Sequence, residues 1–160
     1  KKKQIFEEDL LALADEEQSI SQVKYIDLLD ISIKCGSNKK SLANVKLKYL
    51  GKTLTKESEG TGPIDAAFKA IKSLITTKAH LVVYQVNAIT KGTDAQAEVS
   101  VRLEEGGVSV LGVGNDIDTI VASGKAYING LNKLINKKSK VKDSKKILNP
   151  PNSTIDKHVI

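Results

Sequence analysis

A short glycine-rich segment holds the best candidates for a binding site. Gly60 and Gly62 precede a stretch with helical periodicity, and Asp65 falls within its first turn. A helix N-terminus exposes unpaired N–H groups and a partial positive charge, which suit a carboxylate. Glycine lets a ligand approach the backbone, and Asp65 would take an ammonium group, so the segment suits an amino acid. From spacing alone, an ordinary strand-to-helix turn with Asp65 as a surface acid is the favoured interpretation.

Catalytic chemistry finds little support. The chain has two histidines, His80 and His158, and one cysteine, Cys35, and none has a partner at a spacing typical of catalysis. We expect His80 to have a structural role and the Cys35 side chain to be buried as a small hydrophobic residue. A single cysteine excludes an internal disulfide and a multi-cysteine zinc site, so a reducing compartment is expected. The Gly-x-Gly turns match neither a Walker A nor a dinucleotide motif.

Hydrophobic periodicity predicts the elements that position these residues. Three strands and a helix are expected over residues 22–35, 45–49, 53–59 and 64–75. The same order returns over residues 80–88, 95–103, 108–113 and 117–135. The strand at 80–88 is apolar on both faces, which predicts a central position in its sheet. The fold class is therefore α+β, with two βββα units that form an internal duplication and pack about a pseudo-twofold axis.

Composition divides the chain into three parts. Residues 1–20 include an amphipathic helix at 5–14, expected to be a linker helix that packs on something else. Residues 21–136 form the domain, with repeats at about 21–77 and 78–136. Residues 137–160 are polar and lysine-rich, which predicts a solvated or disordered tail. The chain contains no methionine, and we expect it to be a piece of a longer protein.

The net charge of +6 comes from one segment. Seven lysines and one aspartate lie between Lys133 and Lys146, and the rest of the chain is neutral. The segment lacks aromatic residues and arginine, so a solvated helix end is favoured over a nucleic-acid patch. No apolar run approaches the roughly 20 residues of a membrane span, and no signal peptide is visible. A cytoplasmic protein without nucleic-acid or membrane partners is expected.

Three motifs in order resemble one family. They are GTGPIDAAFKAI at residues 60–71, TKGTDAQAEV at 90–99, and GVG at 112–114 followed by ASGKAYINGLN at 122–132. Together they resemble the C-terminal regulatory domain of 2-isopropylmalate synthases over residues 23–134. The same family includes citramalate synthases. Gly124 departs from the pattern, because many relatives carry alanine there.

The resemblance implies a regulator without chemistry of its own. The parent enzymes condense acetyl-CoA with a 2-keto acid on a (β/α)8 barrel that needs a divalent metal. Leucine, the pathway end product, inhibits them through this C-terminal domain, which dimerises. The implied partners are therefore leucine or isoleucine, a second copy of the chain, and the barrel of the same chain. No cofactor or metal is expected in this part.

Carried over by position, the family's effector pocket would involve nine residues. These are Gly60, Gly62, Asp65, Leu81, Tyr84, Ala88, Ala95, Ala97 and Ile120. Leu81 and Tyr84 would form an apolar wall, while the alanines leave space for a branched side chain. Small residues at positions 88 and 97 favour leucine. An isoleucine-sensing domain of a citramalate synthase, and a dimerisation module without a ligand, remain the alternatives.

Overall fold

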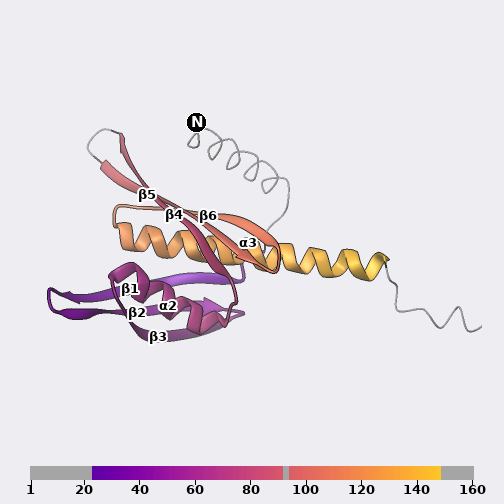
Figure 1. Ribbon diagram of the computed structural model, residues 1–160, viewed down its shortest axis with the longest axis horizontal. Helices are drawn as coiled ribbons and strands as arrows, with labels where there is room; N and C mark the ends of the chain where they lie inside the picture. The colour runs from indigo at the N-terminus through magenta and orange to yellow at the C-terminus, as the bar shows by residue number, and fades with distance from the viewer. Residues whose placement is uncertain (1–22, 92–93, 149–160) are drawn as a thin grey trace, which may run out of the picture.

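The computed structural model describes residues 23–91 and 94–148, which form two antiparallel sheets and two helices (Figure 1). The first unit contains β1 (Ile26–Gly36), β2 (Lys39–Tyr49), β3 (Lys52–Gly60) and helix α2 (Pro63–Ile75). The second contains β4 (His80–Lys91), β5 (Asp94–Glu105), β6 (Val108–Asp116) and helix α3 (Thr119–Leu148). The predicted pair of βββα units is confirmed. The predicted linker helix and residues 149–160 lie outside the described residues.

Tight turns connect the strands where the sequence predicted them. Gly106 and Gly107, between β5 and β6, both have positive φ, 55° and 80°. This pair of positive values is typical of a type I′ turn, whose twist matches that of the flanking strands. The turn from β2 to β3 uses Leu50 and Gly51 at φ 50° and 82°. A leucine in this region is uncommon, and Leu50 donates its backbone N–H to the Tyr25 carbonyl at 3.2 Å.

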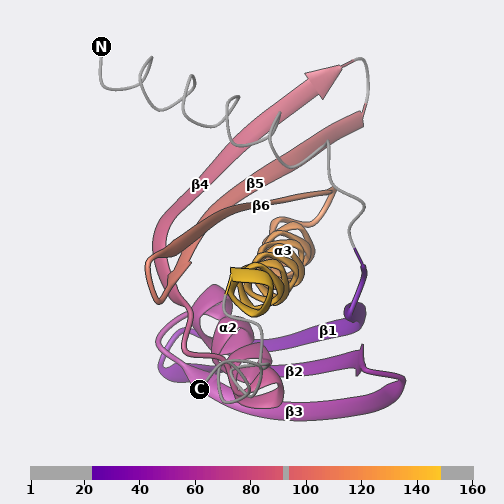
Figure 2. The same ribbon diagram turned by 90° about the vertical axis from the view of Figure 1, so that its right-hand side faces the viewer.

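Helix α3 lies between the two sheets and completes the core (Figure 2). Leu131 and Leu134 of the helix pack among buried residues from both sheets, which include Val45, Leu47, Val99, Val101 and Leu103. The helix approaches β6 closely because that strand carries glycine where it meets the helix. A Cβ on Gly112 would lie 2.2 Å from the Ala126 carbonyl oxygen, and one on Gly114 would lie 2.3 Å from that of Ala122. The second Gly-x-Gly is therefore a helix-packing device.

A β-bulge in β1 changes which of its residues face the core. Strict alternation along the strand predicted at 22–35 would place residues 23, 25, 27, 29, 31, 33 and 35 on one face. Instead, Leu28 pairs with Leu47 and Asp30 with Lys46, so Leu29 is the extra residue. Ile26 is fully buried, whereas Leu29 is 47% exposed. The predicted face is therefore wrong before the bulge. Cys35 is also exposed, with its sulfur 3.4 Å from the Ser41 hydroxyl, and is not a buried hydrophobe.

Strand β4 occupies an edge of its sheet, because the order is β4-β5-β6. The predicted central position is wrong, since β5 is the middle strand. Apolar residues on both faces of β4 remain substantially exposed, Leu81 at 43% and Val82 at 50% among them. The apolar run of β4 therefore does not correspond to a buried strand.

Helix α3 differs from its prediction at both ends. The helix was predicted to begin at Ile117, but this residue lies before the helix and is 76% exposed, so it does not join the apolar side of α3. The helix continues to Leu148, so residues 137–148 are helical where the sequence predicted a tail from residue 137. Lys137 donates to the Ser109 carbonyl at 3.2 Å, and Lys138 pairs with Glu105. None of the described helices is long and apolar enough to cross a membrane.

Candidate functional site

Helix α2 begins without a side-chain cap. Its N-cap residue is Gly62, in extended conformation at φ −149° and ψ 172°, and Pro63 follows at the first helical position. Proline lacks an N–H, and the N–H of Ala66 bonds the Gly62 carbonyl at 3.0 Å. Among the described residues no side chain caps this helix start, so the first turn presents the positive end of the helix.

Asp65 turns back over this helix start. Its Oδ2 accepts the backbone N–H of Thr61 at 3.0 Å and the Thr61 hydroxyl at 3.3 Å, and it pairs with the Lys69 ammonium at 3.1 Å. The backbone hydrogen bond from Thr61, followed by the hydrogen bond from Lys69, lowers the pKa of Asp65 below its usual value. The carboxylate is ionised at neutral pH, and these contacts converge on Oδ2.

The two glycines of the first Gly-x-Gly have different surroundings. A Cβ on Gly60 would lie 2.4 Å from the backbone nitrogen of Ala66, so Gly60 is required for β3 to meet its own helix. A Cβ on Gly62 would meet no atom of the described residues within 4 Å. Its backbone angles also suit other residues, so Gly62 leaves open space at the helix start. Close packing of β3 against α2 therefore explains the glycine at position 60. It does not explain the glycine at position 62, where the backbone is open to approach.

The alanine positions come together on the second sheet. Ala88 pairs with Ala97 and Thr90 with Ala95, while Tyr84 pairs with Val101. Because paired residues share a face, the three alanines and Tyr84 lie on the face that packs against α3 through Val99 and Val101. Ala88 and Ala95 are exposed, and Ala97 is half-buried. This part of the face extends beyond the cover that α3 provides.

Leu81 is separated from the alanines. It pairs with Leu103 near the other end of β4. The partner residues Leu103 and Ala97 are six positions apart on β5, which at about 3.3 Å per residue is roughly 20 Å. Within one chain, Leu81 and Ala88 therefore cannot contact the same small ligand.

Tyr84 connects the sheet to both helices. The Ser123 hydroxyl donates to the Thr119 carbonyl at 2.7 Å, so the Tyr84 hydroxyl, 2.7 Å from that oxygen, is the donor to Ser123. The Tyr84 ring meets Phe68 of α2 edge-on, with centroids 6.0 Å apart, and Phe68 stacks on Tyr127 at 4.5 Å. Sequence reasoning missed Phe68 and Ser123 as neighbours of the wall, since only the tertiary packing brings them to Tyr84.

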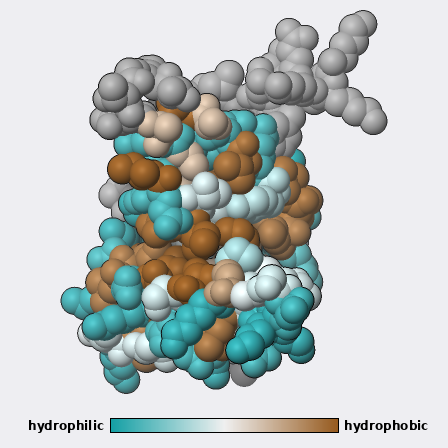
Figure 3. Space-filling model, turned by 90° about the vertical axis from the view of Figure 1, so that its left-hand side faces the viewer, coloured by the Kyte–Doolittle hydropathy of each residue, from teal (hydrophilic) through white to brown (hydrophobic). Residues whose placement is uncertain are grey.

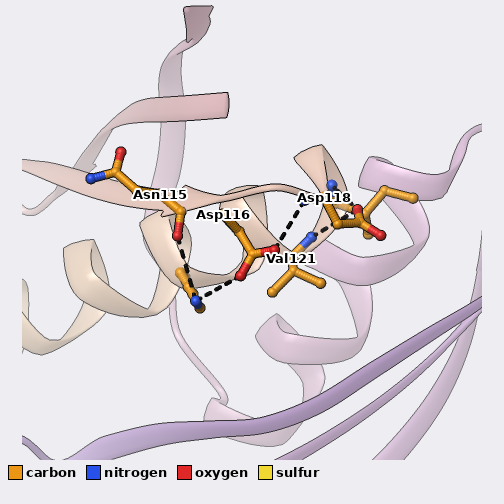
Figure 4. Close-up of polar contacts among 6 residues, drawn as sticks. Asn115, Asp116, Asp118 and Val121 are labelled. Atoms are coloured by element: carbon orange, nitrogen blue, oxygen red, sulfur yellow. Dashed lines mark hydrogen bonds and ion pairs between the residues drawn. The ribbon is translucent and has the colours of Figure 1, made fainter. Parts of the chain in front are cut away.

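The start of α3 is closed by its own side chains (Figure 4). Asp118 Oδ1 accepts the backbone N–H groups of Ile120 at 2.7 Å and Val121 at 3.4 Å. Asp116 accepts the Asp118 N–H at 3.0 Å and pairs with Lys125 at 2.8 Å. The hydrogen bond from Lys125, followed by the one from the Asp118 backbone, lowers the pKa of Asp116. Ile120, half-buried in the first turn, contributes an apolar side chain there.

Both helix starts lie at the same end of the molecule (Figure 1). Seen from that end, hydrophobic side chains gather in a band across the middle of the surface (Figure 3). Gly62, Asp65 and Ile120 belong to the helix starts, whereas Ala88 and Ala97 belong to the sheet. The arrangement offers helix N–H groups, a carboxylate and an apolar wall, and no described group of histidine, cysteine and acidic residues could hold a metal.

The fold and this arrangement define a class: a duplicated βββα domain with an open surface where its helices begin. The family model of the LeuA allosteric (dimerisation) domain matches residues 4–135, and the chain belongs to that family. The resemblance identified from the three motifs is confirmed.

Curated relatives agree with the family model. A 2-isopropylmalate synthase of Bradyrhizobium sp. (strain ORS 278) is 49% identical over 140 residues, 88% of this chain. That of Methylorubrum populi is 47% identical over 134 residues, 84% of the chain. The matched region is only 26% of each of those two relatives. The chain therefore spans about a quarter of their length.

Proposed function

We propose that this domain binds leucine and acts as the feedback regulator of a cytoplasmic 2-isopropylmalate synthase. The observation that carries the proposal is the uncapped start of α2, at the same end of the molecule as the alanine-lined part of the second sheet. The parent enzyme would condense acetyl-CoA with a 2-keto acid on a barrel that holds a divalent metal. The domain would sense the end product and contribute no reacting group.

The chemistry of leucine fits the three parts of the site. Its carboxylate would accept hydrogen bonds from the first-turn N–H groups of α2, beside the open Gly62 position. Its ammonium would pair with Asp65, whose contacts with Thr61 and Lys69 converge on Oδ2 and leave Oδ1 for a ligand. Its branched side chain would lie over Ala88 and Ala97, where small residues leave space.

Calorimetric titration of the chain with leucine, isoleucine and valine tests the effector. Leucine should bind most tightly and raise the melting temperature, because a ligand selective for the folded state stabilises that state. A stronger response to isoleucine would instead favour the domain of a citramalate synthase. No heat and no thermal shift with any of the three, in a chain that still dimerises, would leave only a dimerisation module.

Substitution of the sheet wall tests the position of the site. Ala97→Phe should abolish leucine binding without unfolding the domain, because the ring would fill the space beside Ala88. Thr55→Phe, at an exposed position of β3, is the matched control and should keep leucine affinity. If Ala97→Phe binds leucine normally, the pocket is elsewhere.

A further inference from the structure

The four edge strands of the two sheets are protected to different degrees. An edge strand presents unpaired N–H and C=O groups that can pair with another chain, and soluble proteins usually cover or charge such edges. In the described residues the edges are β1 and β3 of the first sheet, and β4 and β6 of the second. Their comparison shows which edge is left for pairing.

Side chains of α3 cover the edge of β6. Lys125, Asn129, Lys133 and Lys137 recur every four residues along the helix. They bind backbone atoms of Asn115, Val113, Leu111 and Ser109 in turn, at distances of 3.4, 3.0, 2.8 and 3.2 Å. Four helix residues rise about 6 Å and two strand residues about 6.6 Å, so the two repeats stay in step. Three C=O groups and one N–H group along this edge are therefore bound by side chains of α3.

The first sheet protects its edges by other means. Strand β3 carries charged residues along its length, including Lys56, which pairs with buried Val45 and so faces inward. Inward-pointing charge on an edge strand opposes pairing. Strand β1 has its bulge at Leu29, and its start is bound by Asn132 of α3. The Asn132 amide accepts from the Ile26 N–H and donates to the Ile26 carbonyl, both at 2.9 Å.

Within the part of the chain that the structure describes, strand β4 has no comparable protection. Its residues from Leu81 to Thr90 include no charged side chain. An irregularity lies between Leu81 and Val83, after which the strand keeps regular pairing with β5 up to Lys91. Its exposed large apolar residues are Leu81, Val82, Tyr84, Val86 and Ile89, between 36% and 50% exposed. A long, apolar and unprotected edge is a template for pairing with another strand.

We propose that β4 pairs antiparallel with β4 of a second copy of this chain, which joins the two second sheets into one. The chain belongs to a family of dimerisation domains, so the partner that we expect at this edge is a second copy of the chain. A twofold axis perpendicular to a sheet relates two identical edge strands as an antiparallel pair, and such an interface is self-complementary. The pairing goes beyond the proposed leucine site and does not require it.

Sedimentation analysis with charge variants tests the surface. Val86→Lys places a charge on the bare edge strand and should weaken the dimer at least tenfold. Thr55→Lys on the charged edge β3 is the matched control and should leave the dimer unchanged. Circular dichroism of both variants shows whether each remains folded. A monomeric parent chain, or a dimer equally stable in folded Val86→Lys and in the parent, would overturn the proposal.

Disulfide formation tests the geometry even if Val86→Lys fails to fold. Pairing about a twofold axis requires one residue of β4 to lie opposite its own copy, at a Cα separation of about 4.5–5.5 Å, within disulfide range. In a Cys35→Ser background, single cysteines at each position from 83 to 89 should cross-link strongly at one position and weakly on either side. Thr55→Cys should not cross-link. A dimer that cross-links at none of the seven β4 positions contradicts edge pairing.

Discussion

The two repeats share an order of strands and a helix but begin their helices in opposite ways. Helix α2 starts at Gly62 with no side-chain cap and with open space beyond its Cα. Helix α3 starts after Asp118, whose carboxylate binds two of its first N–H groups. A cap satisfies donors that otherwise need another partner. The first repeat therefore starts its helix with donors that have no side-chain cap, where we propose that leucine binds, while the second repeat caps them with its own side chain.

The lengths and contacts of the two helices also differ. Helix α3 has 30 residues, lies between the sheets, and binds the backbone of both β1 and β6 through its asparagines and lysines. Helix α2 has 13 residues and packs mainly on its own sheet. The second repeat therefore supplies the helix at the structural centre, and the first supplies the helix start that we propose for leucine binding.

Substitution of Gly112 should have the largest effect, because it acts where the second repeat is structural. In Gly112→Ala the new Cβ would lie 2.2 Å from the backbone oxygen of Ala126, so α3 must move away from β6. We expect a loss of about 3 kcal/mol in the free energy of unfolding, at the upper end for overpacking. Urea denaturation measures it.

Gly124→Ala is the matched control for that experiment. Its Cβ would meet the Cδ1 atom of Ile31, the end of a flexible side chain that can turn aside. The gain in helix propensity from replacing glycine offsets part of the strain, so the net change should be within about 1 kcal/mol. Equal losses for Gly112→Ala and Gly124→Ala would mean that contact with β6 does not decide the packing of α3.

Gly62→Asp should make the first helix start resemble the second. The extended backbone at Gly62 suits an N-cap, so the new carboxylate would bind first-turn N–H groups and stabilise α2 by up to about 1 kcal/mol. The same carboxylate would occupy the place proposed for that of leucine, and leucine affinity should fall at least tenfold. Thermal unfolding and calorimetry measure the two effects separately. Unchanged leucine affinity would place the ligand carboxylate away from α2.

Local signals in the sequence predicted most of the fold. Periodicity and turn residues located every described strand and both helices, because Pro63, Gly106 and Gly107 act through their own backbone preferences. Two features depended on tertiary contacts that no local pattern records. The bulge at Leu29 shifts the strand period by one residue, and the edge position of β4 follows from sheet order.

The candidate site was predictable only in part, for the same reason. Strand alternation is enough to place Ala95 and Ala97 on one face, and the turn locates Gly62 and Asp65. The hydrogen bond from Tyr84 to Ser123 and the contact of Tyr84 with Phe68 join elements that are distant in sequence. The separation of Leu81 from the alanines appears only once the length and register of β4 are known.

Removal of the cap on α3 should lower the free energy of unfolding without changing leucine affinity. Asp118→Ala leaves the N–H groups of Ile120 and Val121 without their side-chain acceptor, so the free energy of unfolding should fall by about 1 kcal/mol. Leucine affinity should stay within twofold of the parent, because the ligand is assigned to the start of α2. A large loss of leucine affinity in folded Asp118→Ala would show that both helix starts form the site.

Acid titration should give the smallest effect and still separate the two starts. Hydrogen bonds with Thr61 and Lys69, and with Lys125, lower the pKa values of Asp65 and Asp116 below the usual 3.8. Each carboxylate therefore stabilises the fold above about pH 4. That contribution is lost as the pH falls through the folded-state pKa. Both carboxylates are partly accessible to solvent, at 41% and 28% side-chain exposure, so the loss should be slight.

Asparagine variants assign that acid effect to its source. Asp65→Asn and Asp116→Asn should each reduce the fall in melting temperature below about pH 4, because the asparagine that replaces the aspartate does not titrate. Their effects on leucine should differ, because only Asp65 is assigned to the ligand ammonium. Asp65→Asn should weaken leucine binding already at neutral pH, and Asp116→Asn should not. Equal leucine affinity in both variants would remove Asp65 from the site and leave the uncapped N–H groups of α2 as its polar part.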